Sequence, residues 1–290
     1  MCIRDSYILD YGTEEQKQRW LPRLASGEML AGIALTEPGC GSDLKALRTK
    51  ASKDGNGYVM DGAKTFIANG FTANLLVVAV RTGEPGSSGV SLVVLETENL
   101  SGFRVGRRLE KLGQHASDTA ELFLDGVRLK ANQLLGGQEG QGFRQLMSQL
   151  PYERLLLAVP AAAVIERAVE LTVEYTKDRK AFGQSVFDFQ NTRFKLAECA
   201  TLAHVVRSFV NDCIQRLLDG TLDDEAAYMA KWWCTEQQGK VTDECLQLFG
   251  GYGYMAEYPI ARLYADARIQ RIYGGTTEIM KDLIARRLGT

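Results

Sequence analysis

The sequence lacks the features of a membrane-spanning, disordered or nucleic-acid-binding chain. No stretch approaches the roughly 20 apolar residues that a membrane span needs. With 34 basic and 36 acidic residues the formal net charge is −2, and the two signs are interspersed, which leaves no basic face for nucleic acid or an anionic membrane. Proline is scarce, at 6 of 290 residues, and 45% of the residues are hydrophobic. The chain can therefore bury a core without disulfides or a structural metal.

Metal-ligand patterns are also missing. The six cysteines include no Cys-x-x-Cys pair, and His115 and His204 are far apart in the sequence, so we expect no metal site. Most of the cysteines fall inside helical patterns, where a free thiol behaves as a small hydrophobe; these are Cys199, Cys213, Cys234 and Cys245. Such use of cysteine is typical of a reducing compartment. We expect the bacterial cytoplasm, or the mitochondrial matrix for a eukaryotic source.

The N-terminus begins inside a helical pattern. The opening MCIRDS leads directly into YILDYGTEEQKQRWLPRLASGE, which predicts a truncated gene and makes the absence of a targeting signal uninformative. We expect helix over about 7–30. Thr13 is a candidate cap, followed by an acid-rich first turn.

The remaining chain divides into a β region and a helical region. Short β-branched or alternating runs, separated by turn residues, cover 31–37, 57–70, 74–80, 89–96 and 119–129 and predict an antiparallel β domain. From about 140 the hydrophobic period becomes helical, over 142–177, 188–218, 223–249 and 258–288. We therefore expect an α+β protein with a helical N-terminal remnant (1–30), a middle β domain (31–135) and a C-terminal four-helix bundle (136–290).

The segment ALTEPGCGSD, residues 34–43, is the first candidate binding site. Its Pro-Gly-x-Gly turn lets the backbone approach a ligand closely, and Thr36 and Ser42 offer hydroxyls to a polar heterocycle. The alternative is an ordinary strand-ending loop. Neither a dinucleotide-binding Gly-x-Gly-x-x-Gly nor a P-loop is present.

Glu153 is the second candidate, because it precedes a long apolar run. Burial of that helix would raise the carboxylate pKa and make it a usable general base, an effect that Arg154 would offset. The alternative is a solvated first-turn acid that interacts with the helix dipole.

Two further segments carry cations or glycine pairs next to helices. Arg179 lies in DRKAFGQ and is either a phosphate ligand or an ordinary cation at a helix C-terminus. Gly250-Gly251 and Gly274-Gly275 flank a helix rich in Arg and Tyr. Thr276 after the second pair is either a helix cap or part of an anion site.

Four of these segments, in this order, resemble the acyl-CoA dehydrogenase family of flavoproteins: ALTEPGCGSD, KTFIANG, RKAFGQ with Gln190, and QLFGGYGY…RIQRIYGGTTEI. The resemblance covers the chain from residue 7 onward. It implies the family fold of helical domain, β domain and helical bundle, with most of the N-terminal domain missing. It also implies an oligomer, usually a tetramer of two dimers.

In that family FAD is held by the β domain and the bundle, partly from a neighbouring subunit. The resemblance places at the flavin ring Ile33, Leu35, Thr36, Ser42, Phe66, Ile67 and Ala68. It places at the pyrophosphate and adenosine end Arg179, Lys180, Ala181, Gln190, Gln247, Gly250 and Gly251, with Thr276 and Glu278 on the same-subunit side. The family usually has a hydroxyl residue where this chain has Ala68, so only the backbone can bond the flavin there.

A second departure concerns the catalytic base. Most members of the family have a glutamate directly before the Gly-Thr of the last motif, where this chain has Gly274. A minority branch, which includes the long-chain and isovaleryl enzymes, carries its glutamate in a segment resembling P-x-E-R-L-L-L-A, and that residue here is Glu153. Glu278, the nearest other acid, is a poor second choice. The resemblance implies substrate contacts from Ser42, Arg154, Gly274 and Gly275.

The implied activity is α,β-dehydrogenation of a long- or medium-chain acyl-CoA to a trans-2-enoyl-CoA in fatty acid β-oxidation. Glu153 is the expected base, the hydride is expected to go to flavin N5, and an electron-transfer flavoprotein is the expected electron acceptor. The alternatives are an acyl-CoA oxidase or flavin monooxygenase-like relative, or a non-catalytic subunit that binds flavin or acyl-CoA.

Overall fold

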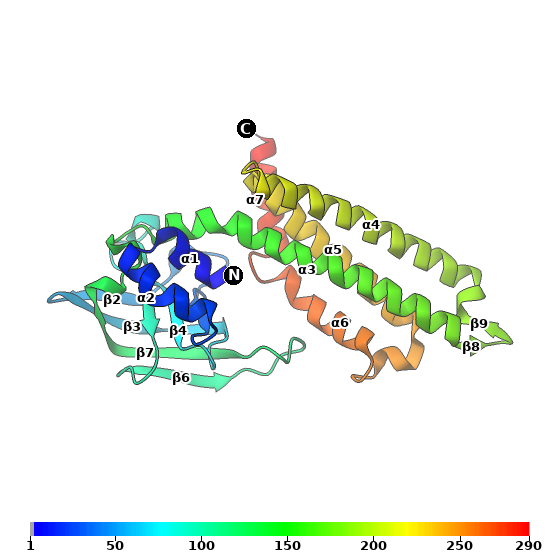
Figure 1. Ribbon diagram of the computed structural model, residues 1–290, viewed down its shortest axis with the longest axis horizontal. Coiled ribbons are helices and arrows are strands. Elements are labelled where there is room, and N and C mark those ends of the chain that lie inside the picture. The colour runs from blue at the N-terminus through cyan, green and yellow to red at the C-terminus, as the bar shows by residue number, and fades with distance from the viewer. Residues whose placement is uncertain (1–2, 290) are drawn as a thin grey trace. The chain divides into compact units, whose positions relative to one another are not determined.

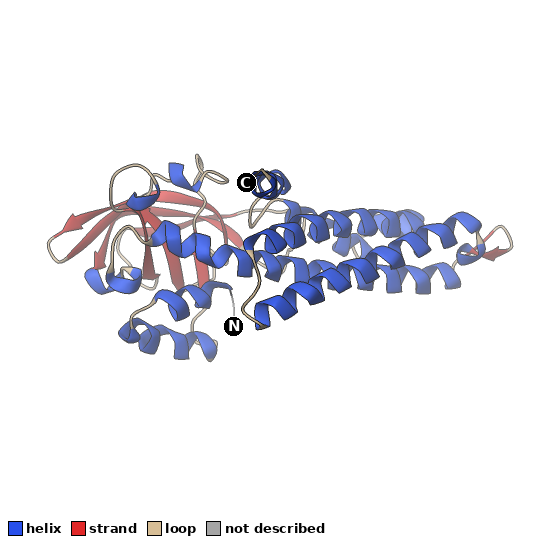
Figure 2. Ribbon diagram, turned by 90° about the horizontal axis from the view of Figure 1, so that it is seen from above, coloured by secondary structure: helices blue, strands red, loops and turns tan. Residues whose placement is uncertain are grey.

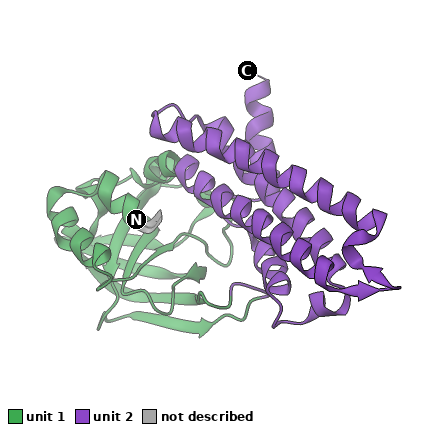
Figure 3. Ribbon diagram, turned by 45° about the vertical axis from the view of Figure 1, so that its right-hand side comes forward, with its two compact units in different colours: residues 1–111, 115–149 green, residues 112–114, 150–290 purple. Residues whose placement is uncertain are grey.

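The computed structural model describes residues 3–289, so Cys2 lies outside the described residues. The chain divides into two compact units, residues 1–111 with 115–149 and residues 112–114 with 150–290 (Figure 3). The finer division into 1–30, 31–135 and 136–290 stays a prediction.

Unit 1 begins with two helices, α1 (Ile3–Tyr11) and α2 (Glu14–Ala25). Gly12 follows α1, and a Cβ there would lie 2.5 Å from the Ile8 carbonyl oxygen, so the expected single helix over 7–30 is two helices. The predicted cap is confirmed, because Thr13 Oγ1 accepts from Gln16 N at 3.3 Å and Gln16 Oε1 accepts from Thr13 N at 3.0 Å. This capping box supplies partners for two N–H groups that the helix itself leaves unpaired.

The β region of unit 1 forms one sheet (Figure 2). Its strands are β1 (Ala31–Ala34), β2 (Lys50–Asp54), β3 (Gly57–Ala68), β4 (Leu75–Arg81), β5 (Val90–Glu96), β6 (Phe103–Arg108) and β7 (Thr119–Lys130). The order is β1-β4-β2-β3-β7-β6, and β5 also pairs with β4. Most pairs are antiparallel as expected, but β1 pairs with β4 in parallel and β2 meets β4 in parallel at one position. The β2–β3 hairpin lies between β1 and β4 in the chain, and this long connection is what a parallel pair requires.

The sheet is buried on both faces along β4 and β5. Leu76 and Val78 of β4 belong to one apolar cluster, whereas Leu75 and Val77 belong to another that also contains Trp20 of α2. Successive side chains of a strand point to opposite faces, so the continuous apolar runs of these strands supply two cores. The helices α1 and α2 cover one of these faces.

Unit 2 is built from long helices (Figure 1). They are α3 (Gly142–Asp178, of which 142–149 belong to unit 1), α4 (Gln190–Leu218), α5 (Asp224–Leu248), α6 (Pro259–Ala267) and α7 (Thr277–Leu288). A small hairpin, β8 (Lys180–Ala181) with β9 (Gln184–Ser185), connects α3 to α4. The single helix expected over 258–288 is α6, a 3₁₀ turn at Arg268–Arg271 and α7. Gly274 and Gly275, with φ of 65° and 98°, interrupt it because a right-handed helix needs negative φ.

Four of the cysteines are part of the apolar core of unit 2. Cys199, Cys213, Cys234 and Cys245 are free and buried, as expected. Within residues 3–289 we find no group of three or more potential metal ligands and no helix long and apolar enough to cross a membrane.

Candidate active site

A turn at Gly274 and Gly275 lies against helix α3 in unit 2. Arg154 Nε of α3 donates to the carbonyl oxygen of Gly274 at 3.3 Å. A Cβ built on Gly274 would lie 2.4 Å from Leu157 Cδ1, which is far inside van der Waals contact. The positive φ of Gly274 disfavours a larger residue there, and a Cβ would also require the Leu157 side chain to move. Position 274 is therefore fitted to glycine.

Glu153 immediately precedes Arg154 and lies one helical turn before Leu157 on α3. Residues four apart share a helix face, so Glu153 shares the face of Leu157 that contacts Gly274. Its side chain is half-buried. The structure thus brings Arg154, Gly274 and Gly275 together and places Glu153 on the face of α3 that carries Leu157; the roles predicted for these residues stay predictions.

Arg154 is a buried cation beside this acid. It is 5% exposed, and its guanidinium lies 4.7 Å from the centre of the Tyr228 ring. Burial lowers the pKa of Arg154, whereas Tyr228, Glu153 and Asp224 act in the opposite direction. The guanidinium still carries its charge near neutral pH, so it favours the ionised form of a neighbouring carboxylate.

The turn continues into the N-terminus of α7. Thr276 is the N-cap, and its Oγ1 accepts from Ile279 N at 3.3 Å. Glu278 is exposed, and hydrogen bonds from its own N–H and from the Thr276 hydroxyl lower its pKa. Both residues therefore serve the helix end, which agrees with the low rank of Glu278 as a base.

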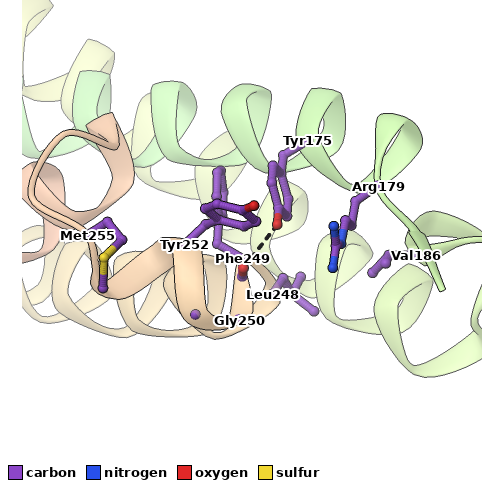
Figure 4. Close-up of a pocket in the computed structure, with 9 residues that line it drawn as sticks. Tyr175, Arg179, Val186, Leu248, Phe249, Gly250, Tyr252 and Met255 are labelled. Atoms are coloured by element: carbon purple, nitrogen blue, oxygen red, sulfur yellow. Dashed lines mark hydrogen bonds between the residues drawn. The ribbon is translucent and has the colours of Figure 1, made fainter.

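A hollow of about 500 Å³ in unit 2 lies where α3 and α5 end (Figure 4). It is lined by Tyr175, Arg179, Val186, Leu248, Phe249, Gly250, Gly251, Tyr252 and Met255. The Tyr175 and Phe249 rings stack at 4.1 Å between centres, and the Tyr175 hydroxyl donates to the Phe249 carbonyl at 3.1 Å. Arg179 lies 5.9 Å from the centre of the Tyr252 ring. The hollow therefore combines flat aromatic surface with one guanidinium.

The expected residues around this hollow divide into lining and neighbouring positions. Arg179, Gly250 and Gly251 line it. Gln190, the first residue of α4, and Gln247, near the end of α5, are exposed and do not line it.

The expected flavin-facing residues of unit 1 gather where β1 ends beside β3. Thr65 N of β3 donates to the Thr36 carbonyl at 2.9 Å. The register of β3 slips between Lys64 and Ile67, and Phe66 within the slip has φ of 58° and is 69% exposed. Positive φ is rare for a bulky side chain and is often found at functional sites.

The other expected residues of unit 1 differ in exposure. Ile33, Leu35 and Thr36 are half-buried, Ser42 and Ala68 are exposed, and Ile67 is 2% exposed. The side chain of Ile67 belongs to the core. Only the backbone groups of Ile67 are therefore available to a ligand.

A buried ion pair holds the loop after β1 against β3. Lys64 Nζ donates to Glu37 Oε1 at 2.8 Å, and both side chains are almost completely buried. Glu37 also accepts from the N–H groups of Arg48 and Thr49. Burial lowers the pKa of Lys64 to about 8 although Glu37 raises it. Burial raises the pKa of Glu37, because it disfavours the charged carboxylate. The hydrogen bonds and charge of Lys64 and the other donors outweigh this effect and hold the pKa of Glu37 below its ordinary value.

Sequence reasoning missed the Lys64–Glu37 pair and a second buried lysine, Lys231 of α5. Lys231 is 0% exposed, and its Nζ donates to the Gly275 carbonyl oxygen. One signal was present: Lys231 lies at helical spacing from Ala227 and Cys234, on an apolar face of the pattern. A lysine on such a face is unusual unless it is paired.

Comparison with known proteins identifies the family. Its models match in order along the chain: acyl-CoA dehydrogenase N-terminal domain at residues 1–28, middle domain at 32–127 and C-terminal domain at 140–289. The mouse mitochondrial long-chain specific acyl-CoA dehydrogenase is 48% identical over 285 residues, which is 97% of this chain. The chain spans 66% of the length of that relative.

Solved structures give the same result. The acyl-CoA dehydrogenase from Geobacillus kaustophilus matches with a TM-score of 0.96 and 48% identity over 99% of this chain and 76% of its own. A Mycobacterium smegmatis glutaryl-CoA dehydrogenase in complex with FADH2 matches with a TM-score of 0.92 and 30% identity over 98% of this chain and 72% of its own. The predicted α+β fold is confirmed. The chain belongs to the acyl-CoA dehydrogenase family of FAD-dependent flavoprotein oxidoreductases.

Proposed function

We propose that the protein catalyses the α,β-dehydrogenation of an acyl-CoA to a trans-2-enoyl-CoA, with Glu153 as the base that removes the α-proton. The observation that carries the proposal is the packing at position 274. There a glycine with positive φ faces Leu157, so an acid would be strained and would displace the Leu157 side chain, while Glu153 lies on the same face of α3 as Leu157.

The chemistry requires a base that is both ionised and poorly solvated, because the α-carbon of a thioester is a very weak acid. Glu153 is half-buried, and the adjacent buried guanidinium of Arg154 favours its ionised form. The developing negative charge on the thioester oxygen needs hydrogen-bond donors. The N–H of Gly274 is the donor that the resemblance assigns, and Arg154 holds that turn from its carbonyl side.

The residues present fit FAD. A Cβ on Gly250 or Gly251 would meet no atom within 4 Å, so glycine leaves the hollow beside Arg179 open at those positions. Arg179 would hold the pyrophosphate through guanidinium–phosphate bonds, and the aromatic rings there would contact the adenosine. Thr36, Ser42 and the backbone of 66–68 would hold the flavin ring. When bound, FAD supplies the acceptor for the hydride that leaves the substrate β-carbon.

The substrate and partners follow the long-chain relative. Its name supports a long-chain acyl-CoA, with medium chains as the neighbouring class, and hence a role in fatty acid β-oxidation. An electron-transfer flavoprotein is the proposed electron acceptor and a homotetramer the proposed assembly. The free buried cysteines support a reducing compartment, which is the bacterial cytoplasm or the mitochondrial matrix.

An anaerobic titration tests the activity and the base together. The FAD-loaded protein is titrated with acyl-CoAs of increasing length. The absorbance of oxidised flavin is followed. We expect bleaching that depends on chain length. Glu153→Gln should retain FAD and acyl-CoA binding but bleach at least about 1,000-fold more slowly, because an amide cannot accept the α-proton.

The matched control is Glu170→Gln, an exposed acid of the same helix that pairs with Arg167 at 3.1 Å. It should bleach like the unsubstituted protein. Ordinary turnover by Glu153→Gln would refute the assignment of the base. Bound flavin that no acyl-CoA bleaches would refute dehydrogenation and favour a binding subunit. Hydrogen peroxide release without an added acceptor would instead favour an oxidase.

A further inference from the structure

Lys231 is a buried charge that the proposed chemistry does not use. It lies in the middle of α5 with no exposed surface, and its ammonium contacts the carbonyl oxygen of Gly275. Burial and the nearby charge of Arg154 lower the pKa of Lys231 to about 8, whereas Glu236 and Glu278 raise it. An apolar side chain of similar size usually costs less in such a place. The ammonium therefore needs an explanation other than stability.

The residues around Lys231 hold a short segment at consecutive positions. Arg154 donates to the Gly274 carbonyl at 3.3 Å, and Lys231 donates to the Gly275 carbonyl. Thr276 caps α7. The Thr277 hydroxyl donates to Glu236 Oε1 of α5 at 2.8 Å. The segment 274–277 is thus fixed by α3, by α5 and by its own cap.

This restraint matters because the segment starts with two glycines. Glycine has more backbone freedom than any other residue, so Gly274 and Gly275 hold φ of 65° and 98° only with outside contacts. In a trans peptide the C=O and N–H groups point in opposite directions. Arg154 and Lys231 therefore turn the N–H groups of Gly275 and Thr276, which share peptides with the bonded carbonyls, to the other side of the turn, and they polarise these groups as donors. The N–H of Gly274 directly precedes these two peptides.

These N–H groups have free hydrogen-bonding capacity. Among residues 3–289, we find no hydrogen bond donated by the N–H groups of Gly274, Gly275 or Thr276. A cluster of oriented backbone donors, backed by two buried cations, suits an oxygen that gains negative charge.

We propose that Lys231 is a positioning residue for the thioester of the acyl-CoA: its bond to the Gly275 carbonyl fixes the turn whose N–H groups receive the thioester oxygen. This inference rests on the proposed function. Lys231 does not touch the substrate and acts through the turn.

Two substitutions separate positioning from simple packing. Lys231→Met removes the donor and the charge but fills the space. Lys231→Gln keeps an N–H donor on a side chain one atom shorter. Packing alone favours methionine at a site with 0% exposure, whereas positioning favours glutamine. Val210→Ala, in the same core but on α4, is the control for general loss of stability.

Three quantities are measured for each variant. The first is hydrogen exchange at Ile279 and Met280, whose N–H groups bond to Thr276 and so report the order of the turn without any cofactor. The second is the rate of flavin bleaching set against acyl-CoA affinity. The third is the pH at which a bound acyl-CoA analogue with sulfur in place of the β-carbon, which cannot be oxidised, loses its α-proton.

For Lys231→Met we expect about tenfold faster exchange and about 10- to 100-fold slower bleaching, with acyl-CoA affinity changed by less than about threefold. The analogue should lose its proton at a higher pH. In all three measurements Lys231→Gln should give values closer to those of the unsubstituted protein than Lys231→Met does. Its melting temperature should be no higher than that of Lys231→Met. Val210→Ala should change the melting temperature alone.

The proposal is overturned if Lys231→Met shows the same hydrogen exchange at Ile279 and Met280 as the unsubstituted protein and deprotonates the bound analogue at the same pH. It is also overturned if all variants, Val210→Ala included, change in step with their melting temperatures. If none of the acyl-CoAs bleaches the flavin of the unsubstituted protein, the proposed function fails instead. The hydrogen-exchange data then still decide whether Lys231 orders the turn.

Discussion

Lys64→Met in the β-sheet unit tests the buried ion pair with Glu37. The two side chains are 0% and 6% exposed, and their charged atoms are 2.8 Å apart. Removing one partner of such a pair costs about 3–5 kcal/mol, because the other charge stays buried without its counterion. Glu37 keeps bonds from two backbone N–H groups, at 2.7 and 2.9 Å. We therefore expect Lys64→Met to lose about 3 kcal/mol of folding free energy, the lower end of this range. Such a loss reduces the folded-to-unfolded ratio by about two orders of magnitude.

The pH dependence gives this prediction a sign. In Lys64→Met, burial still raises the pKa of Glu37, but the lowering effect of Lys64 is gone. Glu37 then takes up a proton readily in the folded variant, so the stability deficit should shrink as the pH falls from 7 towards 4. In Glu37→Gln the unpaired Lys64 loses its proton more easily. Because its pKa is about 8 even with Glu37 beside it, that deficit should shrink as the pH rises towards 8 and stay constant above it.

Urea unfolding at several pH values measures both variants, with hydrogen exchange of the β2–β3 hairpin as the local probe, because the two units need not unfold together. Lys53→Met is the matched control: this lysine is 75% exposed and pairs with Glu139 at 3.2 Å, so its loss should cost less than about 1 kcal/mol. The double variant should cost less than the sum of the two single variants. A deficit below about 1 kcal/mol for Lys64→Met, or equal pH trends for the two single variants, would refute the reasoning.

Three other substitutions have calculable outcomes. Gly274→Ala should destabilise unit 2 by about 2–4 kcal/mol in urea unfolding, because of its positive φ and the Leu157 contact; adding Leu157→Ala should remove part of the effect, and full additivity would contradict the clash. Thr13→Ala should cost about 1 kcal/mol through loss of the capping box with Gln16, and a melting temperature unchanged within error would contradict this. The unsubstituted protein should gain stability relative to Lys231→Met between pH 8 and 10, because the folded state releases the Lys231 proton near pH 8 and the unfolded state near 10.5; a constant difference across that range would show that the amine is not held charged in a buried place.

The sequence predicted the elements with strong periodicity and missed those without it. The long helices α3, α4 and α5 were expected close to their observed bounds, Thr13 was predicted as a cap, and capping was one of the two roles considered for Thr276. The strands β2 and β6 were missed. The residues of β2, KASKD, are mostly exposed, and β6 alternates only over Phe103–Val105 before it becomes basic, so neither strand carries an apolar alternation long enough to be recognised.

The candidate site was predictable to a similar degree. The glycine at 274 and the acid at 153 were identified from resemblance, but their proximity is a tertiary fact that depends on how α3 packs. The side chains that hold the turn were not identified, with the exception of Arg154. Lys231 and the Glu37–Lys64 pair act through burial, which a single sequence indicates only indirectly, as the apolar helix face around Lys231 does.

The contact between Leu157 and Gly274 also bears on how this site can evolve. An acid introduced at position 274 would meet the Leu157 side chain and a backbone conformation that disfavours it, so that single step would harm folding before it gave any catalytic benefit. Moving the base between α3 and the turn therefore takes coordinated changes on two segments about 120 residues apart in the chain. The two locations of the base are then separate adaptive solutions, and lineages that have one should rarely drift into the other.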